Sequence, residues 1–475
     1  NGALEQASST GTLSTRLKMS LPLADLEKTS LQGSVVLSGN DIRMQPVLPV
    51  IEKAQGNIQF TEAGFNLTGV NAQFLDGPIK LEGGTQKLAP RSTEANPLIR
   101  IQGQVTANGL RQAKEFPELS LLAQHADGTS NYTASLGFKG GQSELSIQSQ
   151  LQGMALNLPA PLHKRADEQV AFKFENLIQG LSTSNPSKAL RDQLQLTWGR
   201  TLSATYLRDV SGADPRVIQG RWQVGENFAT PGVALAETGV TASFNLPSFS
   251  VDEWVQVLSP PKSSPAWRPA QSSALSASAQ SYLPTRMTLK ANEVMVQGRQ
   301  LRSVLVSGSR DGHVWRSNLD AKEFSGYLEY RQPNNQNAGR IYARLARLSL
   351  PPSADQTVES LLEDSPLSIP ALDIVVEDLE LRGKKLGRVE IEATNTETNL
   401  PRNTASGEWR LNKLNITLPE ASFKSSGRWV TSKDGTQPAR TEMSFRLDVS
   451  DAGNLLTRLG TKAVSYTHLT LPTKA

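Results

Sequence analysis

The sequence contains no cysteine in 475 residues. Disulfide scaffolds, thiolate metal sites and cysteine nucleophiles are therefore excluded. Aromatic residues make up 6% of the chain and hydrophobic residues 37%, which is little for a length that ordinarily corresponds to about three domains. No run of about 18 apolar residues occurs, so the sequence predicts no membrane-spanning helix of its own. The composition, with 36 glycines and 27 prolines, favours many short strands and turns.

The chain also has no block of charge of one sign. It carries 49 Lys and Arg against 45 Asp and Glu, a formal net charge of +4, and the two signs are mixed along the sequence. Proteins that follow a nucleic acid backbone concentrate positive charge on one face or segment. We therefore expect no nucleic acid partner.

Signatures of catalysis are missing as well. The motifs GxSxG, HExxH and GxxxxGK[ST] do not occur, and the four histidines, His125, His163, His313 and His468, are far apart in the sequence. We expect no catalytic residue, no metal site and no cofactor, and therefore a protein that is not an enzyme. A glycosidase or polysaccharide lyase needs only a few well-placed carboxylates, so an enzyme on a β-scaffold stays open as an alternative.

Short segments alternate apolar and polar residues and are bounded by glycine, the pattern of a β-strand with one apolar side. The clearest are residues 98–105, 134–153, 192–199, 239–247 and 444–450. One apolar side per strand predicts a sheet with one apolar and one solvated face. From strand spacing and chain length we expect roughly 25 to 30 strands.

Two segments repeat each other at an offset of 85 residues: VMVQGRQLRSVLVS (294–307) and LELRGKKLGRVEIE (379–392). Gly298 aligns with Gly383, and each copy predicts a hairpin with glycine at the turn, where a positive φ is needed. A weaker recurrence, Gly-x-Trp, begins at residues 220, 407 and 427. Repetition of one supersecondary unit predicts a stacked architecture in which neighbouring units bury each other.

Short helices are predicted where a capping pattern follows a Leu-Pro strand end, at 250–258 and 353–362, and again at 450–460, closed by Gly460. A linker rich in proline, serine and alanine covers residues 259–281. We therefore expect a β-groove segment at 1–258, the linker, and a second groove segment at 282–463. The tail, 464–475, does not continue the sequence pattern of the preceding segment, and we interpret it as non-native.

The apolar stripes could form the closed core of an ordinary sandwich or barrel. The lean aromatic content, the repeated hairpins and the regular short helices favour a different fold: a mainly β protein whose elongated, curved antiparallel sheet forms a groove, with a few short capping helices. The residues that alternation places in the lining of this groove are Leu194, Leu196, Trp198, Phe244, Leu246, Val294, Val296, Val304, Val306, Leu372, Ile374, Val376, Leu379, Leu381, Val389 and Ile391.

Four segments carry a resemblance to a known family: LQGMALNLPAPLHK (151–164), GRIYARLARLSLP (339–351), the hairpin at 369–393, and EMSFRLDVSDAGNLLTRLG (442–460). In this order they resemble the C-terminal half of the YhdP family, AsmA-like proteins of Gram-negative bacteria. The resemblance spans most of residues 100–460, while residues 1–100 resemble the family only in their general sequence character.

The resemblance implies a bridge-like lipid transport protein. Such a protein would be anchored in the inner membrane by an N-terminal helix, cross the periplasm, and carry phospholipid to the outer membrane, supporting its permeability barrier. The chain opens without a methionine, and we interpret it as a periplasmic fragment whose anchor lies upstream and whose contacts with both membranes lie outside it. Its oligomeric state is left open by the sequence. The alternative from another class is a surface-exposed β-solenoid scaffold or adhesin with a closed core.

Overall fold

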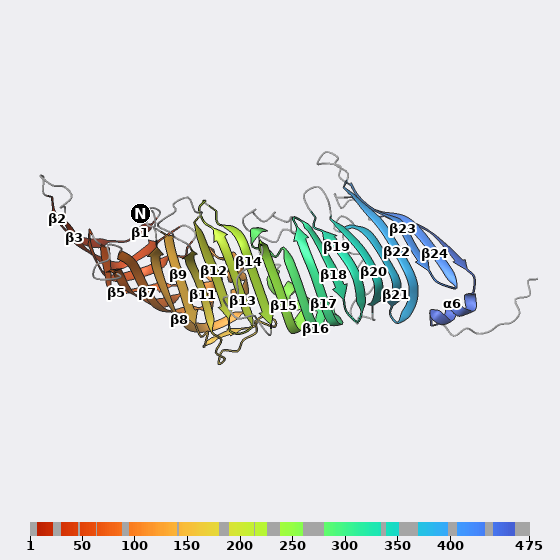
Figure 1. The fold of residues 1–475 in the computed structure, drawn as a ribbon, viewed down its shortest axis with the longest axis horizontal. Helices are drawn as coiled ribbons and strands as arrows, with labels where there is room; N and C mark the ends of the chain where they lie inside the picture. Colours follow the sequence, from red (N-terminus) through yellow and green to blue (C-terminus); the bar gives the residue numbers. More distant parts are fainter. Residues whose placement is uncertain are drawn as a thin grey trace, which may run out of the picture. The chain divides into compact units, whose positions relative to one another are not determined.

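A computed structural model of the chain describes residues 7–21, 30–45, 48–62, 64–87, 95–139, 142–179, 190–212, 214–225, 238–259, 280–333, 339–350, 369–397, 406–432 and 440–460. These residues form 25 strands and a few short helices, many of which are labelled in Figure 1. The sheet is open and mixed. The mainly β fold expected from the sequence is confirmed.

The chain divides into two compact units. Unit 1 comprises Asn1–Leu246, Glu253–Trp267 and Leu275–Leu283, and unit 2 comprises Pro247–Asp252, Arg268–Ala274 and Pro284–Ala475. The linker expected at 259–281 falls almost entirely outside the described residues, as do the helix expected at 353–362 and the tail at 464–475.

Unit 1 is built from β1 to β14 and most of β15. Their bounds are β1 Ser8–Thr10, β2 Leu13–Ser20, β3 Ser30–Arg43, β4 Ile51–Thr61, β5 Gly64–Phe74, β6 Gly77–Lys87, β7 Ala95–Thr106, β8 Ala126–Lys139, β9 Gln142–Ser149, β10 Met154–Leu156, β11 Phe172–Gln179, β12 Arg191–Trp198, β13 Leu202–Asp209, β14 Arg216–Gly225 and β15 Gly239–Ser250. From β2 to β9 each strand pairs antiparallel with the next, and β11 joins the edge of β9.

Two short helices, α1 (Ala107–Gln112) and α2 (Pro117–Ala123), follow β7. The Thr106 hydroxyl caps α1 by accepting a hydrogen bond from the Gly109 amide at 2.9 Å. Gly109 lies so close to the β5–β6 turn that a Cβ on it would stand 1.8 Å from the Leu75 carbonyl oxygen. The helix therefore packs against this turn only because residue 109 has no side chain. The sequence analysis did not predict α1 or α2.

Unit 2 holds β16 to β25. Their bounds are β16 Arg286–Val296, β17 Arg299–Asp311, β18 Val314–Asp320, β19 Phe324–Arg331, β20 Arg340–Leu350, β21 Ala371–Leu381, β22 Lys384–Glu397, β23 Ser406–Thr417, β24 Ala421–Ser432 and β25 Arg440–Val449. Two further helices are described: α3 (Val251–Leu258), which confirms the helix expected at 250–258, and α6 (Ala452–Arg458), which confirms the one at 450–460. No described helix is both long and apolar enough to traverse a bilayer.

The two copies of the repeat form the hairpins β16–β17 and β21–β22. Their turns have positive φ at both central residues, Gln297 (50°) and Gly298 (68°) in one, Arg382 (52°) and Gly383 (74°) in the other. This is the type I′ geometry whose twist matches that of the flanking strands. The prediction of a glycine turn with positive φ is confirmed in both copies.

Each of these hairpins contains a step that changes which residues face the core. In β16 the inward-facing positions are two residues apart as far as Ala291, but the next one is Val294, three residues on. In β17 the same three-residue interval separates Leu301 from Val304. Ser303, with φ of +53°, lies in this step. In the second hairpin the register shifts between Val376 and Leu379. The steps keep the apolar residues of both halves of each strand on one face.

The sheet departs from the expected antiparallel pairing at two places. Strands β14 and β15 run parallel, and so do β20 and β21. The reason is the length of the connections, residues 226–238 and 351–370, because a parallel neighbour requires a connection of about a dozen residues or more. The other strand pairs given above are antiparallel.

Candidate functional site

One face of the sheet in unit 1 is apolar across ten strands. Residues directly opposite each other in a ladder share a face, so the register traces rows of side chains across the sheet. The central row, from β5 to β15, consists of Val70, Leu81, Ile101, Ala134, Ile147, Phe174, Leu196, Ala204, Trp222 and Ala242. Every residue of this row is apolar or aromatic. We call this surface the apolar face of unit 1.

Unit 2 has a corresponding face across all ten of its strands. Its central row, from β16 to β25, consists of Leu289, Val306, Leu319, Gly326, Leu345, Val376, Val389, Ile416, Phe423 and Leu447. Beside it lies a second row that includes Ala343, Ile374, Ile391 and Leu414. We call this surface the apolar face of unit 2.

The opposite face of the unit 2 sheet carries ion pairs. Arg344 contacts Asp373 at 2.7 Å and Arg316 contacts Glu329 at 3.2 Å. A hydrogen bond from Lys413 and the charge of Arg388 lower the pKa of Glu390. The sheet therefore has a mainly hydrocarbon side and an ionic side.

No second sheet packs over the apolar faces in the described part of the chain. Strands make their main contacts with neighbours in the same sheet, and α1 and α2 contact β7 and β8. Many side chains on the faces are therefore only half-buried, and those of edge strand β25 are exposed: Phe445 by 72% and Leu447 by 53%. Half-buried hydrocarbon on this scale is unusual for a protein surface and is typical of a surface that takes an apolar partner.

One phenol of the unit 1 face is shielded from water. Tyr132, which lies opposite Gly103 and Ser149 beside the central row, has its pKa raised to about 12 by burial. Its ring is partly buried and packs against the cluster that contains Val70, Ala72 and Ile79.

One margin of the unit 1 face carries a buried ion pair. The Arg208 guanidinium donates to Asp192 through Nε at 2.9 Å and to the Tyr282 hydroxyl through Nη1 at 2.9 Å. Burial opposes the charged form, but the hydrogen bonds to Asp192 and Tyr282 raise the pKa of Arg208 overall. The Tyr206 hydroxyl donates to the Tyr282 carbonyl and accepts a hydrogen bond from Trp222 Nε1. The two charges are thus paired with each other, and the guanidinium has a further partner in the Tyr282 hydroxyl.

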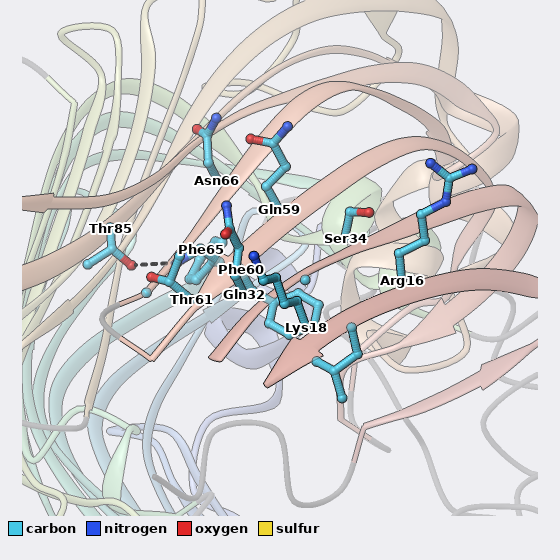
Figure 2. A pocket seen from close by; sticks show the side chains of 13 residues that line it. Arg16, Lys18, Gln32, Ser34, Gln59, Phe60, Thr61, Phe65, Asn66 and Thr85 are labelled. Carbon is cyan, nitrogen blue, oxygen red and sulfur yellow. Dashed lines mark hydrogen bonds between the residues drawn. The ribbon is translucent and has the colours of Figure 1, made fainter. Parts of the chain in front are cut away.

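A hollow of about 610 Å³ lies among β2 to β6 of unit 1 (Figure 2). The Phe60 ring lies where a Cβ on Gly33 would be, and the Phe65 amide donates to the Thr85 hydroxyl at 3.1 Å. In Figure 2 the side chains of Arg16, Ser34, Gln59 and Asn66 point to one side of their strands. The residues around the hollow include no carboxylate and no histidine, so it holds no acid–base pair. The sequence analysis did not predict it.

The structure places the predicted lining residues on the two apolar faces. Leu194, Leu196 and Trp198 alternate along β12 on the unit 1 face, and Phe244 and Leu246 continue it on β15. On unit 2, Val294, Val296, Val304 and Val306 belong to the first hairpin, and Leu372, Ile374, Val376, Leu379, Val389 and Ile391 to the second. Leu381, at the end of β21, is 38% exposed. Contact of these side chains with a ligand remains a prediction.

Many residues that complete the rows are not among the predicted lining residues. Those on β5 to β9, on β18 to β20 and on β23 to β25 follow the same alternation and could have been found by it. In the described residues, no group of three or more histidine, aspartate or glutamate side chains is arranged to hold a metal ion.

The YhdP protein family model matches residues 1–466 of the chain. No curated protein and no solved structure matches it. The match extends the resemblance noted for residues 100–460 to the N-terminal part of the chain. By this match the chain belongs to the YhdP family, of the AsmA-like type.

Proposed function

We propose that this protein is a non-enzymatic carrier of phospholipid, which moves along the apolar faces of the sheet between the inner and the outer membrane. In this proposal the chain acts in the periplasm of a Gram-negative bacterium. It is held at the inner membrane by a helix outside this sequence, and it supports the permeability barrier of the outer membrane. Membership of the YhdP family and the large open sheet support this function.

The single observation that carries the proposal is the row of ten residues across ten strands in each unit, which contains no polar side chain and has no second sheet over it in the described residues. A pocket for a small molecule would need only a few strands. Rows of this length give similar surroundings to a hydrocarbon chain at every strand, so that a bound lipid can move from one strand to the next with little change in free energy.

The physical need for such a surface is large. Moving a phospholipid through water exposes its two acyl chains, at about 0.8 kcal/mol per methylene, or on the order of 20 kcal/mol in total. A sheet with hydrocarbon on one side and ion pairs on the other covers the chains and leaves the headgroup in solvent. No bond is made or broken, so no catalytic residue is needed.

The experiment that tests the proposal is mass spectrometry of the lipids that co-purify with the folded protein. Phospholipid bound in at least stoichiometric amount is the expected result. Absence of lipid from protein purified without detergent would contradict the proposal. It would favour a β-scaffold or adhesin in which the apolar side chains of the strands form a closed core. Degradation of a polysaccharide by the same preparation would favour an enzyme.

A further inference from the structure

The three described tryptophans of unit 2 lie along the same margin of its apolar face. Trp315 pairs with Tyr330 across β18 and β19, and Trp409 pairs with Trp429 across β23 and β24. The register connects the two pairs through Ile341, Leu372, Ala393 and Leu411, which is two residues from Trp409. We call these four residues, Trp315, Tyr330, Trp409 and Trp429, the aromatic margin.

Apart from Arg299, opposite Val296, and Lys384, opposite Leu381, at the two hairpin turns, the opposite margin of the same face is hydrocarbon. It carries Leu301 beside the first hairpin turn, Phe324 at the start of β19, Leu348 near the end of β20 and Val449 at the end of β25. The other two described tyrosines of unit 2, Tyr327 and Tyr342, lie on the ionic face, where the Tyr342 ring contacts the Arg344 guanidinium at 4.1 Å. The two margins therefore differ in their aromatic content although they belong to one surface.

The polar ends of the aromatic margin are largely free. Among the described residues, the indole N–H groups of Trp315 and Trp429 and the hydroxyl of Tyr330 have no hydrogen-bond partner, while Trp409 Nε1 donates to the Pro370 carbonyl at 3.3 Å. All four side chains are half-buried. A donor shut away from water would cost free energy, so these ends must stay in contact with water or with a polar ligand.

A cation adds to the polarity of this margin. The Arg310 guanidinium lies over the Trp315 ring, 5.8 Å from its centroid, and donates to the Pro284 and Gly312 carbonyls. Tryptophan and tyrosine are enriched where an apolar phase meets water, because the ring enters the hydrocarbon and the N–H or O–H stays in the polar layer. The margin has the composition of such a boundary.

We infer that a phospholipid bound to unit 2 lies with its headgroup at the aromatic margin and with the ends of its acyl chains toward the hydrocarbon margin. This inference rests on the proposed function and adds an orientation to it. The headgroup passes the polar ends of Trp315, Tyr330 and Trp429, and the chains cover the rows of aliphatic side chains between the margins.

Two labelled variants test the orientation. The chain has no cysteine, so Met443→Cys, next to the aromatic margin, and Val449→Cys, at the hydrocarbon margin, each accept one fluorophore. Both positions lie on the same face of β25 and are exposed, by 57% and 42%, so they tolerate a label equally well. They are about 20 Å apart along the strand.

Each variant is titrated with phosphatidylcholine that carries a nitroxide either on the headgroup or near the end of an acyl chain. The label at 443 should be quenched more by the headgroup probe, and the label at 449 more by the chain probe, so that the quenching ratios of the two sites differ by about two-fold or more. Equal or reversed ratios would overturn the inference and leave the proposed function standing. No quenching by either probe at either site would contradict the proposed function itself.

A further variant tests whether an aromatic side chain at this margin orients the lipid. Trp429→Leu keeps a hydrocarbon side chain and removes the indole N–H. The quenching ratio at position 443 should move toward that at 449, whereas an unchanged ratio would show that the aromatic margin does not orient the lipid.

Discussion

Asp192 and Arg208 form a buried ion pair at a margin of the unit 1 face, with side-chain exposures of 3% and 13%. Replacing Asp192 by alanine leaves the guanidinium without its partner, and we expect the free energy of unfolding in urea to fall by about 3–5 kcal/mol. Asp448→Ala, which breaks the exposed pair with Arg446 (51% and 76% exposed), is the control and should cost less than about 1 kcal/mol. Equal effects of the two substitutions would show that the Asp192 pair is not buried in solution.

Tyr132 makes the stability depend on pH in alkali. Its pKa is raised to about 12 from an ordinary value of 10.0, so the folded protein keeps a proton that the unfolded chain loses near pH 10. The stabilisation is present below pH 10 and is lost as the pH rises through 12. Compared with Tyr132→Phe, the unmodified protein should lose free energy of unfolding over this range; parallel curves for the two proteins would contradict the burial of this phenol.

At the scale of the element, the hairpin turns need glycine where both central residues have positive φ. Gly383 has φ of +74° with no atom within 4 Å of a Cβ built on it, so Gly383→Ala tests backbone strain alone and should cost about 1 kcal/mol. Gly137→Ala is the control: its backbone is extended, its Cβ would meet nothing closer than 4.0 Å, and the substitution should be neutral or slightly stabilising. If thermal unfolding finds both substitutions neutral, the type I′ turn is absent in solution.

The same hairpins show how far the sequence determines the fold. Alternation and glycine spacing predicted the strands, the repeat and the turns, because these depend on neighbouring residues. Alternation alone does not predict the step at Ser303, which brings Val294 onto the same face as Ala291. The parallel pairs and the packing of helix α1 against Leu75 depend on contacts between distant segments, which no local pattern contains. Asp192 and Arg208 lie opposite each other in the β12–β13 hairpin, but apolar alternation does not predict a charged pair on the apolar side.

At the scale of the whole molecule, lipid movement should fail when a charge interrupts the apolar rows. Ile391→Asp and Val306→Asp each place a carboxylate where no cationic partner lies, and burying it under an acyl chain costs several kcal/mol. We expect lipid transfer between donor and acceptor vesicles to fall by about ten-fold or more, since each 1.4 kcal/mol is ten-fold.

The controls for this prediction put the same carboxylate on the opposite face of the same strands. Thr394→Asp in β22 and Ser307→Asp in β17 occupy exposed positions and should leave transfer unchanged. Circular dichroism establishes that all four variants fold. Normal transfer by folded Ile391→Asp and Val306→Asp, or equal loss in the controls, would contradict a path along the apolar face.

The most direct measurement of the path is photocrosslinking of bound lipid, with p-benzoylphenylalanine placed at paired positions on the two faces. Leu319, Ile391 and Leu447 lie on the apolar face of unit 2, and their neighbours Asn318, Glu392 and Arg446 lie on the ionic face. The account predicts crosslinks to phospholipid at the first three positions and none at the other three. Crosslinks in equal yield on both faces, or on neither, would contradict it.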